Sequence, residues 1–137
     1  MGRRALKITA DTNLLVRAIT TDDQKQAAVA TNELQTASLV ALPIPALCEV
    51  AWVLGAGYSL KRPEIAAALR GILSAQNTVT DDESALAGLA ALDAGGDFAD
   101  GVIAFEGSAL GGTEFVSFDR KAVMMLKNQG RAARLLA

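Results

Sequence analysis

The stretch Leu6-Lys7-Ile8-Thr9-Ala10-Asp11-Thr12-Asn13-Leu14-Leu15 predicts the fold of this chain. Apolar and polar residues alternate over residues 6–10, which is the two-residue period of a β-strand. The polar turn Asp-Thr-Asn follows, and apolar residues from Leu14 to Ile19 then predict a short helix. Open α/β sheets place their active sites at the carboxyl ends of strands. Asp11 therefore stands where a functional acid is expected.

The rest of the chain repeats this alternation of strands and helices. Further strands are predicted at residues 38–44, 77–80, 115–118 and 132–136, and further helices at 24–37, 46–55, 64–74, 81–94, 97–110 and 122–127. Strands that alternate with helices are typical of a parallel sheet covered by helices on both faces. We expect one α/β domain over residues 1–137, with a central parallel sheet of about four or five strands.

The composition excludes several kinds of chemistry. The chain has 137 residues, one cysteine (Cys48) and no histidine, which excludes an internal disulfide, Cys/His zinc sites and Ser-His-Asp triads. A net charge of −2 does not predict nucleic-acid binding from bulk electrostatics. No stretch approaches the roughly 20 apolar residues of a membrane span, and a signal peptide is not evident. We expect a cytoplasmic protein without a membrane segment.

Two acids follow predicted strands. Asp11 and Asp119 each stand between an apolar strand and a helix, so either one could simply be a helix N-cap. Pairing of the two strands in one parallel sheet would instead bring both carboxylates to the same edge. The repeated arrangement is more informative than either acid alone.

Two more acids lie within apolar helices. Glu49 is the only charge in residues 46–55; buried charges are rare unless they are paired or bind a metal, and the alternative is that Glu49 reaches water. In the segment Gly96-Asp97-Phe98-Ala99-Asp100-Gly101, Asp97 fits an N-cap. Asp100 shares a helix side with apolar residues at positions 103 and 104, so we favour Asp100 as the inward-facing acid.

A cluster of such acids would point to metal chemistry. Neighbouring carboxylates without a neutralising base repel one another, and they need a cation or raised pKa values. Ligation by oxygen alone suits Mg²⁺ or Mn²⁺. A divalent ion of this kind can activate water and stabilise charge on a phosphate. The acids therefore favour phosphodiester hydrolysis that needs no histidine.

Four segments together resemble the PIN-domain ribonucleases, and specifically the VapC-type toxins of bacterial toxin–antitoxin pairs. They are residues 8–17 (ITADTNLLVR), 45–54 (PALCEVAWVL), 96–104 (GDFADGVIA) and 115–120 (FVSFDR). Each motif alone is weak, but their order and spacing are fairly specific. The resemblance spans almost the whole chain. This chain departs from the family after Asp119: some members carry additional acids there, whereas this chain has Arg120 and Lys121.

The resemblance implies a site and partners. Asp11, Glu49, Asp100 and Asp119 would surround Mg²⁺ or Mn²⁺, with Asp11 and Asp100 as direct ligands. The resemblance also implies RNA as the substrate, a homodimer, and a cognate VapB-like antitoxin that occupies the active-site groove. The supporting residues that it implies are Thr12, Asn13, Ser117 and the less essential acid Asp97.

Several alternatives remain open from the sequence. The chain could be a catalytically silent PIN-like module that binds RNA or protein, or a phosphotransfer domain with Asp11 as the acceptor. Trp52 is expected in the core or at a dimer interface, with base stacking as the alternative. Five cations could contact RNA phosphates or be solvated surface: Arg17, Lys61, Arg62, Arg120 and Lys121.

Overall fold

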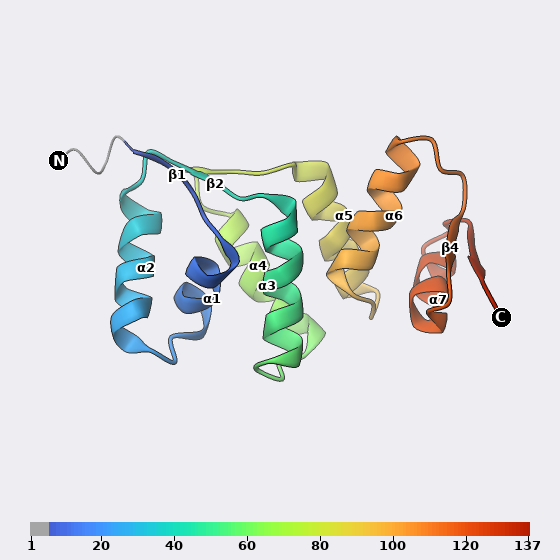
Figure 1. The fold of residues 1–137 in the computed structure, drawn as a ribbon, viewed down its shortest axis with the longest axis horizontal. Coiled ribbons are helices and arrows are strands. Elements are labelled where there is room, and N and C mark those ends of the chain that lie inside the picture. Colours follow the sequence, from blue (N-terminus) through green and yellow to red (C-terminus); the bar gives the residue numbers. More distant parts are fainter. Residues whose placement is uncertain (1–5) are drawn as a thin grey trace.

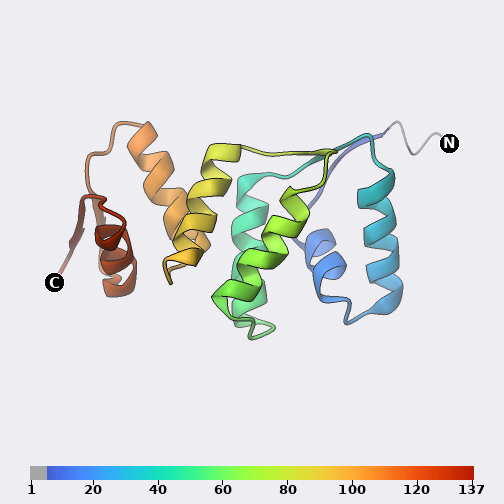
Figure 2. The same cartoon turned by 180° about the vertical axis from the view of Figure 1, so that it is seen from behind.

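The computed structural model describes residues 6–137, which form seven helices and two small parallel sheets (Figure 1; Figure 2 gives the opposite view). In chain order the elements are β1 (Lys7–Thr9), α1 (Thr12–Thr20), α2 (Gln24–Thr36), β2 (Leu39–Ala41), α3 (Ile44–Ala56), α4 (Arg62–Leu73), β3 (Thr78–Val79), α5 (Asp82–Asp93), α6 (Phe98–Ala109), β4 (Phe115–Ser117), α7 (Arg120–Asn128) and β5 (Ala133–Leu135).

Local signals set the starts of the helices. Four helices follow an aspartate whose side chain accepts a backbone N–H of the first turn: Asp11 before α1, Asp23 before α2, Asp81 before α5 and Asp119 before α7. Helices α3 and α4 instead carry a proline in their first turn, where its missing N–H removes no helical hydrogen bond. The predicted order of elements is therefore present, with shorter strands than predicted.

The prediction of one central sheet of four or five strands is wrong. Strands β1, β2 and β3 form one parallel sheet in that order, with Ile8 opposite Val40 and Val40 opposite Thr78. Strands β4 and β5 form a separate parallel pair, with Val116 opposite Arg134. The two sheets lie toward opposite ends of the long axis of the molecule (Figure 1). The α/β class is right, but the strands are divided between two sheets.

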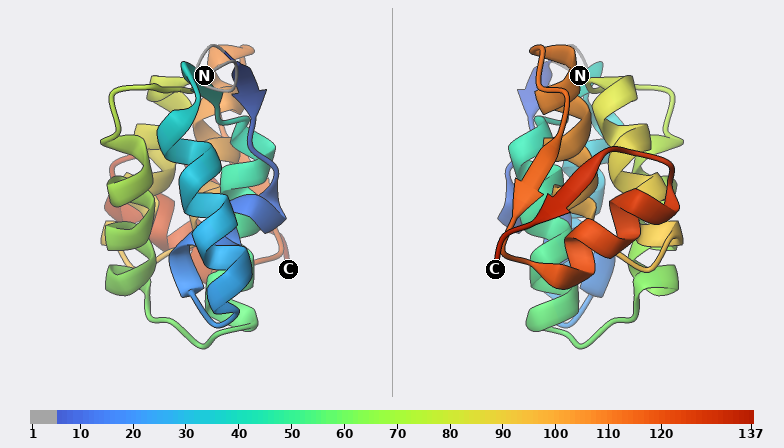
Figure 3. Two further views of the ribbon diagram at one scale, coloured as in Figure 1. Left: turned by 90° about the vertical axis from the view of Figure 1, so that its left-hand side faces the viewer. Right: turned by 90° about the vertical axis from the view of Figure 1, so that its right-hand side faces the viewer.

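Helices α5 and α6 pack closely against each other between the two sheets (Figure 1). A Cβ on Gly88 would fall 2.6 Å from Cδ1 of Phe98, and a Cβ on Gly101 would meet the backbone carbonyl of Ala87. Only glycine allows such a close approach of α6 to α5. After α6, β4 pairs with β5, its neighbour across the short helix α7 (Figure 3). Closing this short connection costs less chain entropy than reaching back to β1.

Two groups of buried side chains accompany the two sheets. The larger group spans the N-terminal sheet and helices α1 to α6, and it includes Leu15, Val40, Leu47 and Phe98. The smaller group joins α5 and α6 to α7 and β5 through six residues: Ala91, Ala104, Val123, Met125, Leu126 and Ala133. None of the helices in residues 6–137 combines the length and apolar character needed to cross a bilayer.

Candidate functional site

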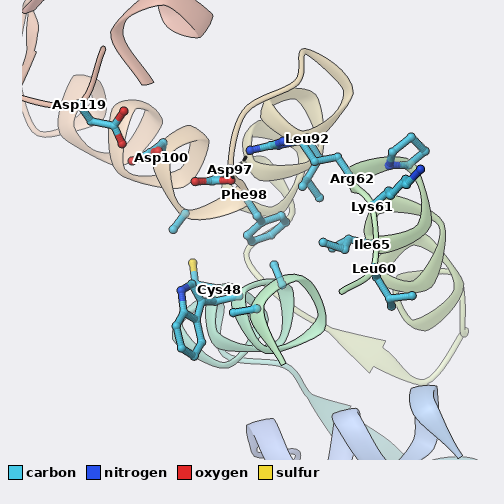
Figure 4. A pocket seen from close by; sticks show the side chains of 15 residues that line it. Cys48, Leu60, Lys61, Arg62, Ile65, Leu92, Asp97, Phe98, Asp100 and Asp119 are labelled. Carbon is cyan, nitrogen blue, oxygen red and sulfur yellow. Dashed lines mark hydrogen bonds and ion pairs between the residues drawn. The ribbon is translucent and has the colours of Figure 1, made fainter. Parts of the chain in front are cut away.

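A groove with a volume of about 860 Å³ is lined mostly by residues of α3, α4 and α6 (Figure 4). Its base is apolar because the buried side chains of Ile65, Leu92 and Phe98 line it. Polar groups stand around this base. They include Lys61 and Arg62 at the start of α4, and a set of three acids, Asp97, Asp100 and Asp119, which we call the acid trio.

Asp100 is the central acid of the trio. Its side chain is half-buried on α6, between the carboxylates of Asp97 and Asp119 in Figure 4. Burial raises the pKa of Asp100, and the negative charges of Asp97 and Asp119 raise it further. Within residues 6–137 no hydrogen bond to the Asp100 carboxylate offsets this repulsion. A cation near Asp100 would therefore be stabilised.

Asp97 is held by Arg62 across the groove. Arg62 Nη2 donates to Asp97 Oδ1 at 3.0 Å, and Arg62 Nε donates to the Gly96 carbonyl at 2.8 Å. Asp97 occupies the N-cap position of α6, but its side chain caps no backbone N–H. The exposed ion pair thus neutralises part of the charge at one end of the trio. This agrees with the prediction that Asp100, rather than Asp97, is the inward-facing acid.

Asp119 is fixed by the turn between β4 and α7. Its Oδ1 accepts the backbone N–H groups of Lys121 at 3.0 Å and Ala122 at 3.2 Å. Its own N–H donates to Ser117 Oγ at 2.9 Å, so Ser117 helps to fix the turn that carries Asp119. Oδ1 therefore caps the helix, whereas Oδ2 has no hydrogen-bond or ion-pair partner within residues 6–137.

A second group of polar residues gathers at the carboxyl end of β1. Asp11 is exposed, and its Oδ1 accepts the Leu14 N–H at 2.9 Å as an N-cap. Thr12 Oγ1 donates to Glu49 Oε1 at 3.0 Å. Glu49 is exposed, so the alternative that it reaches water is the correct one. We call Asp11, Thr12 and Glu49 the β1 group.

The β1 group borders a different cavity. Asp11 and Asn13 line a shallower hollow of about 330 Å³ between α1 and α2, together with Arg17 and Lys25. The expected meeting of Asp11 and Asp119 at one sheet edge does not occur, because β1 and β4 belong to different sheets. No three acidic or cysteine side chains in residues 6–137 are close enough to hold one metal ion.

Helix α3 contributes to both places. Glu49 contacts Thr12 of the β1 group, whereas Cys48 and Trp52, one turn apart, line the groove. Trp52 is 72% exposed, so it does not pack in the core, and its place at a dimer interface stays a prediction. Nearly every residue of α3 is apolar, so the sequence offered little signal of which face would point outward. The one indication in the sequence is that Cys48 and Trp52 are four residues apart, a spacing that puts two side chains on the same face of a helix.

The acid trio has the right chemistry for a hard divalent cation. Mg²⁺ keeps several waters and is usually bound through one or two carboxylates together with phosphate oxygens of the substrate. Asp100 and Asp119 could supply those carboxylates, with Asp97 engaged by Arg62. The residues fit a metal site that is completed by water and substrate, rather than the closed set of four acids predicted from the sequence.

Comparison with known proteins does not add a family. No family model matches the chain, and no curated protein matches it. The resemblance to PIN-domain ribonucleases therefore rests on the four motif segments alone.

Proposed function

We propose that this protein is a metal-dependent endoribonuclease that hydrolyses RNA phosphodiester bonds in the groove of the acid trio. The observation that carries the proposal is the position of Asp100, half-buried between Asp97 and Asp119 in a groove that also holds Lys61 and Arg62. Concentrated negative charge favours a divalent cation, and the nearby cations favour a phosphodiester backbone. The motif resemblance points to the same chemistry.

In this proposal the residues of the groove have three roles: metal binding, positioning of the acids and phosphate binding. Asp100 and Asp119 would hold Mg²⁺ or Mn²⁺, which when bound supplies an activated water and stabilises charge on the phosphate. Arg62 keeps Asp97 in place, and Ser117 and the first turn of α7 keep Asp119 in place. Lys61 has no carboxylate partner within residues 6–137, so its ammonium is available to an RNA phosphate.

Further parts of the proposal rest on the resemblance. They are action in the cytoplasm, a homodimer, and inhibition by a VapB-like antitoxin that covers the groove. Asp11 and Glu49 stay proposed site residues on the same ground, with Thr12 and Asn13 as their supports, although they border a separate cavity.

The test is RNA cleavage by the purified full-length chain with Mg²⁺ or Mn²⁺ and with EDTA. We expect cleavage only with metal, and we expect Asp100→Asn and Asp119→Asn each to lower the rate by about 100-fold or more, the usual scale for losing a group that stabilises charge in a transition state. Asp82→Asn is the matched control, because it removes an exposed acid from the first turn of α5, outside the groove. Metal-independent cleavage, or full activity in both groove variants, would contradict the proposal.

The same assay decides the role of the β1 group. Asn is as good an N-cap as Asp, so Asp11→Asn removes a charge without removing the cap on α1. Loss of cleavage in Asp11→Asn and Glu49→Gln would assign the β1 group to the active site. Unchanged cleavage would assign the chemistry to the groove alone.

The separation of the acids favours a second candidate function. Since no three acids in the described part of the chain can hold one ion, the protein could be a catalytically silent module that binds RNA or a partner protein. RNA binding without cleavage under any divalent metal would support this candidate over the nuclease.

A further inference from the structure

Trp52 is the most unusual side chain of the groove. It is 72% exposed, although aromatic side chains normally bury most of their large surface. Its helix α3 buries Ala46, Leu47, Val50, Ala51 and Leu54, so the helix has a well-formed inner face and Trp52 lies outside it. The exposed indole therefore contributes little to the core and is available for a ligand.

The position of Trp52 relates this indole to the proposed chemistry. Trp52 lines the same groove as Lys61 and the acid trio. The groove thus combines an aromatic ring, a cation with no carboxylate partner among the described residues, and acids suited to a metal. Proteins that bind single-stranded nucleic acid combine base-stacking aromatic side chains with cations along the backbone.

We propose that Trp52 stacks on an unpaired base of RNA and that Lys61 binds an adjacent phosphate, so that the scissile strand is held in the groove. This inference rests on the proposed function for the identity of the ligand, and it adds the residues that select an unpaired nucleotide. A base inside a duplex is already stacked on its neighbours, so duplex RNA gains nothing from the indole. The groove should prefer single strands or loops.

The chain offers a direct readout, because Trp52 is its only tryptophan. The wild-type chain in EDTA is titrated with a ten-nucleotide RNA single strand and with the corresponding ten-base-pair duplex. We expect saturable quenching of tryptophan fluorescence by the single strand and much weaker quenching by the duplex. The absence of metal separates this binding from cleavage.

Variants separate stacking from simple apolar contact. With labelled RNA, we expect Trp52→Ala and Trp52→Leu to weaken binding roughly 5- to 150-fold, and Trp52→Phe to restore most of the affinity. Lys61→Gln should lower the slope of log affinity against log salt by about 1, whereas Lys127→Gln, an exposed cation outside the groove, should not change it. Equal affinity of wild type and Trp52→Ala would overturn the inference.

Other outcomes distinguish failure of the stacking inference from failure of the nuclease proposal. Cleavage by the wild type with unchanged RNA affinity in Trp52→Ala would overturn base stacking and leave the nuclease proposal standing. Single-strand binding that depends on Trp52, without cleavage under Mg²⁺ or Mn²⁺, would overturn the nuclease proposal and support stacking. A blue shift of tryptophan emission with protein concentration alone, with a doubled mass, would show that a second copy covers Trp52, which overturns the inference.

Discussion

The acid trio and the β1 group use the same kinds of side chain in different ways. In the β1 group, Asp11 caps α1 and Glu49 accepts a hydrogen bond from Thr12, and both acids are exposed to water. In the acid trio, Asp100 is half-buried and has two like charges as neighbours. The same kinds of acid therefore serve local structure in the β1 group and leave an unfavourable charge in the acid trio.

The difference shows how a possible ligand site can be recognised without a bound ligand. An acid that has a hydrogen-bond donor and free access to water is already satisfied. An acid held next to other acids by the fold is less stable than it would be in water, and a bound cation removes that penalty. Changes to each group should therefore have different effects on stability and cleavage.

The largest expected effect comes from removing the apolar support of the trio. Phe98 is 1% exposed and precedes Asp100 by two residues, so Phe98→Ala should destabilise the fold by about 3–5 kcal/mol in urea unfolding. Leu15→Ala, a fully buried control beside the β1 group, should destabilise by about 2–5 kcal/mol. At temperatures where both variants stay folded, we expect only Phe98→Ala to lose cleavage. Equal loss in both would contradict a groove centred on the trio.

The next largest loss of stability is expected from removing the two helix N-caps, Asp119 and Asp11. Asp119→Ala and Asp11→Ala should each cost about 1 kcal/mol, with the larger loss at Asp119, whose Oδ1 accepts two N–H groups against one at Asp11. The corresponding Asn variants should keep nearly all the stability. Thermal unfolding of the four variants measures this. A large loss in the Asn variants would mean that charge, rather than capping, is what these positions contribute.

A smaller effect is expected from the hydrogen bond within the β1 group. Thr12→Val keeps the shape of the side chain but removes the donor to Glu49, and we expect a loss below about 1 kcal/mol because the bond is exposed. Thr36→Val, which removes another exposed threonine hydrogen bond within α2, is the matched control. Unfolding in urea at pH 7 compares the two, and a much larger loss at Thr12 would show that Glu49 is held for a purpose beyond the fold.

The smallest change in stability should have the opposite sign. Because the folded state raises the pKa of Asp100 above its ordinary 3.8, the ionised side chain reduces stability as pH rises above that value. Asp100→Asn should therefore be slightly more stable than wild type at pH 7, and the gain should vanish as pH falls toward 3.8. Adding Mg²⁺ should raise the melting temperature of wild type more than that of the variant. A variant less stable than wild type at pH 7 would contradict this.

Local patterns were enough to predict the elements. Alternating residues predicted β1, and aspartates and prolines predicted most helix starts. The sequence also favoured Asp100 over Asp97 as the inward acid, because residues three and four positions apart share a helix face. The exposure of Glu49 and Trp52 was harder to predict, because an apolar helix such as α3 does not reveal which side meets its neighbours.

The sequence by itself determined the order of strands and helices, the absence of histidine chemistry and the set of candidate acids, because these depend on residues close together in the chain. Only the tertiary structure decided which strands pair and which acids meet. Strand β4 pairs with β5 and not with β1, so Asp119 and Asp11 do not share a sheet edge. Pairing across long stretches of chain depends on the packing of every element between them, which no local pattern contains.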